Sequence, residues 1–252
     1  RRKNRQHQKV KPLEQVLTIS ELGWHGDGLA DVEGKRIFVP FTLAGETVRA
    51  MVTGNRAKIL EIIEPSPQRI KPPCPHFTHC GGCAVQHLDP QPYADWKRHV
   101  IVRALENRDI DSSVEPLVDA HGDGRRRVTL HTRFISNGVQ AGFMQAHSHK
   151  LIDLDRCPIL DPELEKATAI ARDLATPLAS HPKPLDIQIT VTESGLDCDI
   201  RGAGELSMDA RMGLSDCAIA HDLARITVAG DLVLERRPPI LTFGAAKVTL
   251  PP

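Results

Sequence analysis

Three of the chain's six cysteines, Cys74, Cys80 and Cys83, fall within ten residues in the stretch KPPCPHFTHCGGCAVQHL. Thiolates grouped this closely are typical ligands of zinc or of an iron–sulfur cluster, and sites of both kinds usually have four ligands. A catalytic cysteine is disfavoured, because thiols clustered at metal-binding spacing usually act as ligands. The stretch therefore predicts a metal centre that needs one more ligand from elsewhere in the chain.

We expect this fourth ligand to be Cys157, which lies in DLDRCPIL at a strand end and, like Cys74, directly precedes a proline. Cys198 lies in an alternating strand pattern and Cys217 on the apolar stripe of a helix, so both are expected to be core thiols. The pair Gly81-Gly82 lacks Cβ atoms where the backbone has to curve round a cluster, and its N–H groups can point at sulfur. The spacing alone leaves zinc and iron–sulfur equally open.

The segments on either side of the cysteines predict two folding units. Five short strands are expected over residues 13–63, separated by turns that contain glycine, which favours a small all-β, OB-like barrel at residues 12–71. Five prolines between positions 65 and 75 then predict a stiff, extended linker.

Residues 72–252 predict an α+β domain built from antiparallel strands. Asp89-Pro90 indicates the start of a helix over residues 91–107, and Asp161-Pro162 the start of a second helix. Hairpins are expected at Asn137-Gly138 and Ser194-Gly195, and a short helix near 207–220. In the first hairpin, Arg127, His131 and Arg133 alternate with apolar residues, so they are expected to share one face of the sheet.

The net charge of zero averages over an uneven distribution. The first eleven residues hold six basic residues and no acid, which predicts a basic arm at residues 1–11 and a polyanionic partner. No apolar run reaches the roughly 20 residues of a membrane helix. Clustered thiols in a chain of 252 residues differ from a secreted disulfide framework, so we expect a cytoplasmic protein. We also expect a monomer, although no pattern in the sequence sets the oligomeric state.

The box CPHFTHCGGCAVQHL, followed by DRCPIL, resembles the iron–sulfur-containing RNA (uracil-5-)methyltransferases that act on 23S ribosomal RNA. DGLADVEGKRIFVPFTLAGETV is similar to the TRAM domain of that family, a five-stranded RNA-binding barrel. GFMQAHSHKLIDLDRCPIL and PPILTFGAAKVTLPP are similar to its central domain, so the resemblance covers residues 13–252. It implies a [4Fe–4S] cluster, rather than zinc, on Cys74, Cys80, Cys83 and Cys157.

The resemblance also implies that catalysis resides in an S-adenosylmethionine (SAM) domain, which we expect after residue 252. The chain shows no glycine-rich strand-to-helix turn of a nucleoside-binding loop, so no catalytic residue is assigned and the chain alone is expected to be inactive. The chain is expected to bind RNA through phosphate contacts and shape. The expected RNA is 23S rRNA, with tRNA as the alternative. The candidate RNA-binding residues are Lys35, Arg36, Arg56, Lys58 and Arg69 in the barrel and linker, and Arg125, Arg126, Arg127 and Arg133 in the hairpin. An alternative of a different class is a stand-alone RNA-binding module with a structural metal and no activity.

Overall fold

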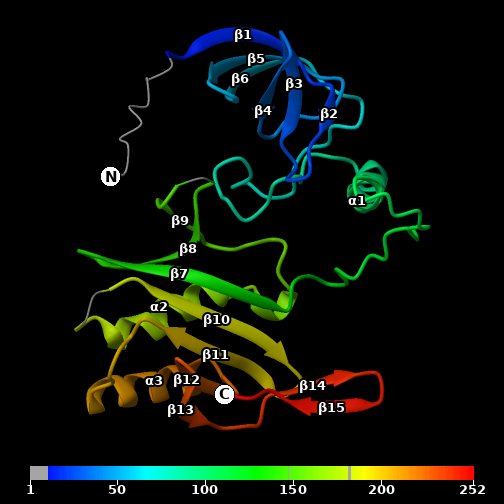
Figure 1. The fold of residues 1–252 in the computed structure, drawn as a ribbon. Helices are drawn as coiled ribbons and strands as arrows, with labels where there is room; N and C mark the ends of the chain where they lie inside the picture. Colours follow the sequence, from blue (N-terminus) through cyan, green and yellow to red (C-terminus); the bar gives the residue numbers. More distant parts are fainter. Residues whose placement is uncertain (1–10, 147, 181–182) are drawn as a thin grey trace, which may run out of the picture. The chain divides into compact units, whose positions relative to one another are not determined.

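The computed structural model describes residues 11–146, 148–180 and 183–252, and the chain divides into two compact units (Figure 1). The first unit runs up to Thr78 and includes Cys83–Val118, and the second consists of His79–Gly82 and Asp119–Pro252. Of the basic arm expected at residues 1–11, only Lys11 lies among the described residues. Within the described part of the chain, no helix is both long and apolar enough to cross a membrane.

A curled six-stranded sheet forms the body of the first unit, in the order β1-β5-β6-β4-β3-β2 (Figure 1). Its apolar positions alternate inward to a core that includes Leu17, Val39 and Val48. Where the sequence predicts five short strands over residues 13–63, the structure has six. The elements of this unit are β1 (Leu13–Thr18), β2 (Glu21–Leu22), β3 (Gly28–Val32), β4 (Lys35–Val39), β5 (Thr47–Thr53), β6 (Arg56–Glu64) and α1 (Pro90–Glu106).

A buried ion pair holds the proline-rich linker against the six-stranded sheet. The Glu46 carboxylate is fully buried and accepts hydrogen bonds from Arg69 Nε at 2.5 Å and Nη2 at 2.8 Å. The backbone N–H groups of Leu43 and Ser66 donate to the same carboxylate. Burial alone raises the pKa of Glu46, but these hydrogen bonds and the Arg69 charge outweigh it and leave the pKa below its usual value.

Backbone pairing closes the loop that carries the cysteines. Arg69 forms an antiparallel bridge with Leu88, and the carbonyl of His87 accepts a hydrogen bond from Ile70 N at 2.9 Å. The His87 side chain is fully buried, and its ring lies 5.2 Å from that of Phe77, which in turn contacts Phe41 edge-on. Burial, together with the nearby Arg69 charge, lowers the pKa of His87 to about 4, so the ring is neutral at pH 7.

Helix α1 begins as the sequence predicts. The Asp89 side chain accepts a hydrogen bond from Gln91 N, and Pro90 occupies the first helical position. Arg103 of α1 forms an ion pair of 2.7 Å with Glu21 of β2, which joins the helix to the sheet of the same unit.

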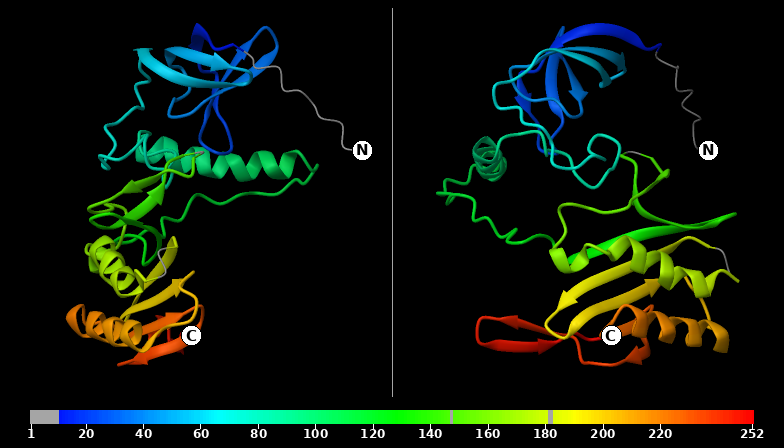
Figure 2. Two further views of the ribbon diagram at one scale, coloured as in Figure 1. Left: turned by 90° about the vertical axis from the view of Figure 1, so that its left-hand side faces the viewer. Right: turned by 180° about the vertical axis from the view of Figure 1, so that it is seen from behind.

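The second unit is built on a seven-stranded sheet in the order β13-β12-β11-β10-β7-β8-β9. Its strands pair antiparallel except β11 and β12, which are parallel. Helices α2 and α3 cover one face of this sheet and enclose its core (Figure 2). The elements are β7 (Arg127–Ile135), β8 (Gly138–Met144), β9 (Leu151–Asp153), the 3₁₀ turns Pro162–Leu164 and Thr176–Leu178, α2 (Ala167–Ala175), β10 (Leu185–Thr192), β11 (Gly195–Arg201), α3 (Met208–Ala220), β12 (Arg225–Val228), β13 (Asp231–Glu235), β14 (Ile240–Phe243) and β15 (Ala246–Thr249).

Acid should destabilise the first unit through His87. An unfolded histidine has a pKa near 6.5, whereas the pKa of folded His87 is about 4. Between these two pH values the unfolded chain therefore binds more protons than the folded chain, and a fall in pH favours unfolding. The stability present above pH 6.5 is therefore reduced by about 2 kcal/mol at pH 5. Urea unfolding followed by tryptophan fluorescence measures this loss, because both tryptophans, Trp24 and Trp96, belong to the first unit.

His87→Leu should flatten this pH dependence between 6.5 and 4, whatever it does to stability at pH 7. His99→Ala is the matched control, because His99 is exposed on α1 of the same unit. An unchanged pH profile in His87→Leu would show that the acid sensitivity has another origin.

Candidate functional site

The segment that carries Cys80 is fixed to the end of β8. Cys80 bridges Gln145, and Gly81 N donates to the carbonyl of Met144 at 2.9 Å. A Cβ at position 81 would lie 2.8 Å from that carbonyl oxygen, so only glycine fits there without displacement. Gly82 N points at Cys80 Sγ, 3.4 Å away, as the sequence suggested for this glycine pair.

Cys157 begins a tight turn in the second unit. Leu160 N donates to the carbonyl of Cys157 at 3.3 Å, and the half-buried Cys157 side chain packs against the core of the unit. Arg125 holds the turn from the other side, with hydrogen bonds between its backbone and Ile159 O and Asp161 N. Gly124 makes this approach possible, because it has φ +138° and a Cβ there would lie 2.4 Å from the carbonyl carbon of Leu160.

Cys74 and Cys83 belong to the first unit, whereas Cys80 and Cys157 belong to the second. The carbonyl of Cys74 accepts a hydrogen bond from Phe77 N, which places the start of the cysteine box beside the buried Phe77 ring. None of the six cysteines, all of which are described, forms a disulfide. Among the described residues, no three His, Cys, Asp or Glu side chains form a set able to hold a metal ion.

Of the two remaining cysteines, Cys198 lies in the core as the sequence predicts, whereas Cys217 is half-buried and packs against the edge of that core. Cys198 is fully buried on β11, and burial, with a smaller effect of Asp197, raises the pKa of its thiol strongly. Cys217 on α3 donates to the carbonyl of Asp173, and burial followed by the charges of Asp173 and Asp216 raises its pKa. Both side chains therefore remain thiols at neutral pH, which is unfavourable for metal binding.

The basic candidates of the first unit lie on neighbouring strands, with one exception. Lys35 and Arg36 are exposed at the start of β4, and Arg56 and Lys58 are exposed at the start of β6. Strands β4 and β6 are neighbours in the sheet, paired at Phe38 and Arg56. Arg69 differs, because its guanidinium binds Glu46 and the carbonyl of Phe41.

The basic candidates of the second unit are spread along β7. Arg125, Arg126 and Arg127 are exposed at the start of the strand, next to the turn of Cys157. Arg133 is exposed near the other end of β7, six residues on, which corresponds to roughly 20 Å of extended strand. Three of these arginines are thus consecutive at the start of β7, and Arg133 lies near its other end.

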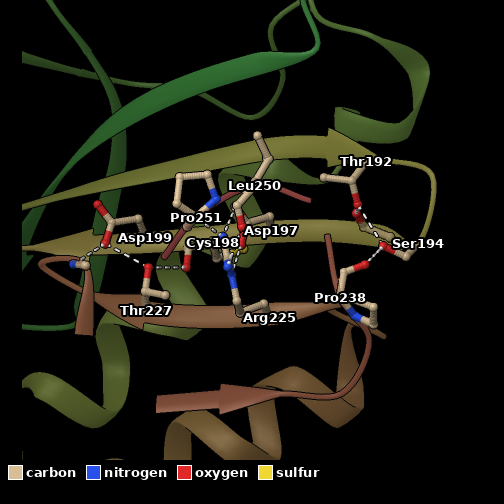
Figure 3. Close-up of polar contacts among 12 residues, drawn as sticks. Thr192, Ser194, Asp197, Cys198, Asp199, Arg225, Thr227, Pro238, Leu250 and Pro251 are labelled. Atoms are coloured by element: carbon tan, nitrogen blue, oxygen red, sulfur yellow. Dashed lines mark hydrogen bonds and ion pairs between the residues drawn. The ribbon is translucent and has the colours of Figure 1, made fainter. Parts of the chain in front are cut away.

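A buried cluster that sequence reasoning missed is centred on Arg225 of β12 (Figure 3). Arg225 is only 3% exposed, and its guanidinium binds both carboxylate oxygens of Asp197, at 2.8 and 3.1 Å. Its remaining donors bind the carbonyls of Leu250 and Pro251, each at 2.9 Å. The signal in the sequence was the isolation of Arg225, one of only three basic residues against ten acids in residues 186–235.

No protein-family model matches the chain. A protein of Caulobacter vibrioides named as an uncharacterised RNA methyltransferase is 41% identical over 246 residues, which covers 94% of this chain and 59% of that protein. One of the same name in Brucella suis is 39% identical over 236 residues, covering 94% of this chain and 57% of the relative. Nearly the whole of this chain is therefore similar to a part of proteins named as RNA methyltransferases.

At lower identity the chain matches a relative with a defined target. The 23S rRNA (uracil(1939)-C(5))-methyltransferase RlmD of Halomonas elongata is 35% identical over 204 residues, covering 77% of this chain and 42% of that enzyme. The chain spans a little under three fifths of the length of the more similar methyltransferases.

Gly124→Ala should displace the turn that carries Cys157. The added Cβ meets backbone atoms of Leu160 and Asp161, which cannot move aside as a flexible side chain would, and we expect a loss of about 2 kcal/mol or more. Hydrogen exchange at the amides of Arg125 and Asp161 should become faster, because both amides donate across this contact.

Gly122→Ala is the matched control, since Gly122 also has positive φ, at +53°, but a Cβ there meets nothing within 4 Å. We expect Gly122→Ala to leave exchange at the Cys157 turn unchanged. Equal effects of the two substitutions would mean that backbone conformation, and not the close approach at Gly124, controls the turn.

Proposed function

We propose that this chain is the RNA-binding and [4Fe–4S]-bearing part of a SAM-dependent RNA (uracil-5-)methyltransferase that acts in the cytoplasm on 23S rRNA. The observation that carries the proposal is the alignment of 94% of the chain with proteins named RNA methyltransferases at 39–41% identity. The match to an enzyme named for uracil C5 of 23S rRNA supports the choice of base and RNA. The cysteine box supports the metal centre.

In this proposal the chemistry belongs to a SAM domain that follows residue 252. A cysteine thiolate of that domain adds to C6 of uracil, and C5 then attacks the methyl group of SAM, so that S-adenosylhomocysteine leaves. A base of the same domain takes the C5 proton, and the thiolate is expelled as the ring regains its double bond. The target uridine has to be turned out of its stack, which requires that other contacts hold the surrounding RNA. We propose that the chain described here, as a monomer, provides those contacts.

We propose Cys74, Cys80, Cys83 and Cys157 as the ligands of the cluster. Four thiols outside any disulfide are the donor set that a [4Fe–4S] cluster needs. The N–H group of Gly82 directed at Cys80 Sγ fits as well, because N–H groups directed at sulfur stabilise thiolates and tune such clusters. When bound, the cluster supplies a covalent link among four thiolates, and Gly81 and Gly124 hold the backbone of two of these ligands in place.

We propose that RNA binds in the first unit at Lys35, Arg36, Arg56 and Lys58, on a sheet we identify with the TRAM barrel, and in the second unit at Arg125, Arg126, Arg127 and Arg133. Exposed guanidinium and ammonium groups on neighbouring strands suit phosphate contacts, which position RNA without reading its sequence. Arg69 is left out of this set because Glu46 and Phe41 occupy its guanidinium. Its proposed role is to position the linker.

Removal of Cys157 should abolish the cluster. Protein purified without oxygen should be brown, absorb near 400 nm and contain about four iron and four sulfide ions per chain. Cys157→Ser should lose most of this iron, whereas Cys217→Ser, the matched control with a half-buried thiol outside the ligand set, should retain it. Colourless, zinc-loaded wild type, or full iron in Cys157→Ser, would exclude this ligand set.

The methyltransferase proposal is tested with labelled SAM. A full-length parent protein should produce 5-methyluridine in 23S rRNA transcripts, whereas the 252-residue chain should bind the RNA without methylating it. No methyluridine with the full-length protein, or a gene that stops after Pro252, would favour the alternative of a stand-alone RNA-binding module.

The proposed RNA surface is tested by measuring RNA binding of the Arg126→Glu variant at several salt concentrations. Loss of one phosphate contact should weaken RNA binding several-fold and reduce the slope of log K against log salt by about one. Arg211→Glu is the control, because Arg211 is exposed on α3 and is not one of the proposed RNA contacts. Equal effects of the two substitutions would indicate a response to net charge alone.

A further inference from the structure

The hairpin of β14 and β15 forms a two-stranded sheet of its own, separate from the seven-stranded sheet (Figure 1). Phe243 pairs with Ala246 and Leu241 with Val248, so these four apolar side chains share one face of the hairpin, which we call the ribbon face. The opposite face carries Ile240, Thr242, Lys247 and Thr249. The hairpin is therefore amphipathic.

The ribbon face is open to solvent in this chain. Phe243 is 57% exposed and Val248 is 44% exposed, and every residue of β15 is exposed. A two-stranded hairpin is only marginally stable in water unless its apolar face packs against another element. The face is also uncharged, because residues 238–252 contain no acid and a single basic residue, Lys247, which lies on the other face. Such a surface fits an apolar protein partner.

The base of the hairpin, in contrast, is firmly held (Figure 3). At the entry, the hydroxyl of Ser194 donates to the carbonyl of Pro238, and Ile240 N donates to the same hydroxyl. At the exit, Leu250 N donates to Pro239 O, and the buried Arg225 binds the carbonyls of Leu250 and Pro251. An exposed apolar hairpin thus stands on an anchored base, which is the arrangement of a docking arm.

We infer that the ribbon face is the surface on which the SAM domain docks. The inference rests on the proposed function, which puts that domain after residue 252. Since Arg225 fixes Leu250 and Pro251 beside the hairpin, the segment that follows starts within a few residues of the ribbon face. A tethered domain meets the face at an effective concentration of about millimolar, far above that of a second copy of the chain. RNA is a poor partner for the ribbon face, because the face has no positive charge to bind a phosphate.

The test compares Phe243→Thr in the 252-residue chain and in the full-length parent. Threonine keeps a strand-forming side chain but removes the apolar ring. In the 252-residue chain, where Phe243 is exposed, the melting temperature should stay within about 1 °C, whereas in the parent it should fall by about 3 °C or more. Lys247→Thr, on the opposite face of the same hairpin, is the matched control and should leave both proteins unchanged.

Hydrogen exchange gives a second readout that does not depend on activity. The amides of residues 240–249 should exchange at least about tenfold more slowly in the parent than in the 252-residue chain, because docking suppresses opening of the hairpin. Phe243→Thr should remove most of this difference, and Lys247→Thr should preserve it.

Three results would overturn the inference. The first is equal exchange of the hairpin in both proteins. The second is an equal loss of melting temperature in both, because the face would then be covered within this chain. The third is weaker RNA binding in Phe243→Thr with both melting temperatures unchanged, which would assign the face to RNA. A parent that methylates 23S rRNA but shows any of these results refutes the docking surface alone, whereas a parent without methyl transfer refutes the proposed function.

Discussion

The arrangement of the first unit depends on one buried carboxylate. Glu46 is fully buried, and a charge in that position is tolerated only because Arg69 and two backbone N–H groups satisfy it. Two of its donors, Arg69 and Ser66, belong to the linker that follows the six-stranded sheet. The ion pair therefore decides where the linker leaves the sheet, and with it where the cysteine-bearing loop starts.

The loop itself has no regular structure, so its course is set by contacts at a few points. The bridge between Arg69 and Leu88 closes its two ends, and the rings of Phe77 and His87 pack beneath it. Gly26, in the turn between β2 and β3, allows Val85 to approach so closely that a Cβ there would lie 2.4 Å from the valine side chain. These contacts fix the backbone of the loop at several points, which would reduce the entropy cost of forming the metal centre proposed above.

Local patterns in the sequence predicted the local elements well. Asp89-Pro90 starts a helix, Asn137-Gly138 and Ser194-Gly195 lie at hairpin turns, and the alternation in β7 buries Val128 and Leu130 while leaving Arg127 exposed. These features depend on residues close in sequence, whose capping and turn preferences act directly. The helix expected from Asp161-Pro162 instead begins as a 3₁₀ turn, and α2 starts only at Ala167.

The long-range contacts could not be predicted in the same way. Asp197 faces Arg225 only because β11 and β12 pair in parallel, a register that no local pattern specifies. In the sequence, Arg69 looked like one more basic residue near a proposed RNA surface. Its partner, Glu46, lies 23 residues earlier in the chain, with the strands β5 and β6 between them. A basic residue can be assigned to RNA binding from sequence only if no buried acid of the same chain pairs with it. The sequence does not show which acids are buried, so the pairing of Arg69 could not be foreseen.

The two buried ion pairs solve the same physical problem in opposite senses. Glu46 is neutralised by Arg69 and then accepts backbone N–H groups, whereas Arg225 is neutralised by Asp197 and then donates to backbone carbonyls. In each case the ion-paired side chain also binds backbone groups of an irregular segment. These backbone groups have no helix or sheet partners, so the side chain fixes the segment in their place. For an enzyme of the proposed kind this matters more than overall stability, because RNA bound to one part of a chain is methylated only if the connections to the catalytic part keep a defined geometry. Buried ion pairs that bind these irregular segments set that geometry better than larger apolar cores would, because hydrogen bonds are directional whereas apolar contacts are not.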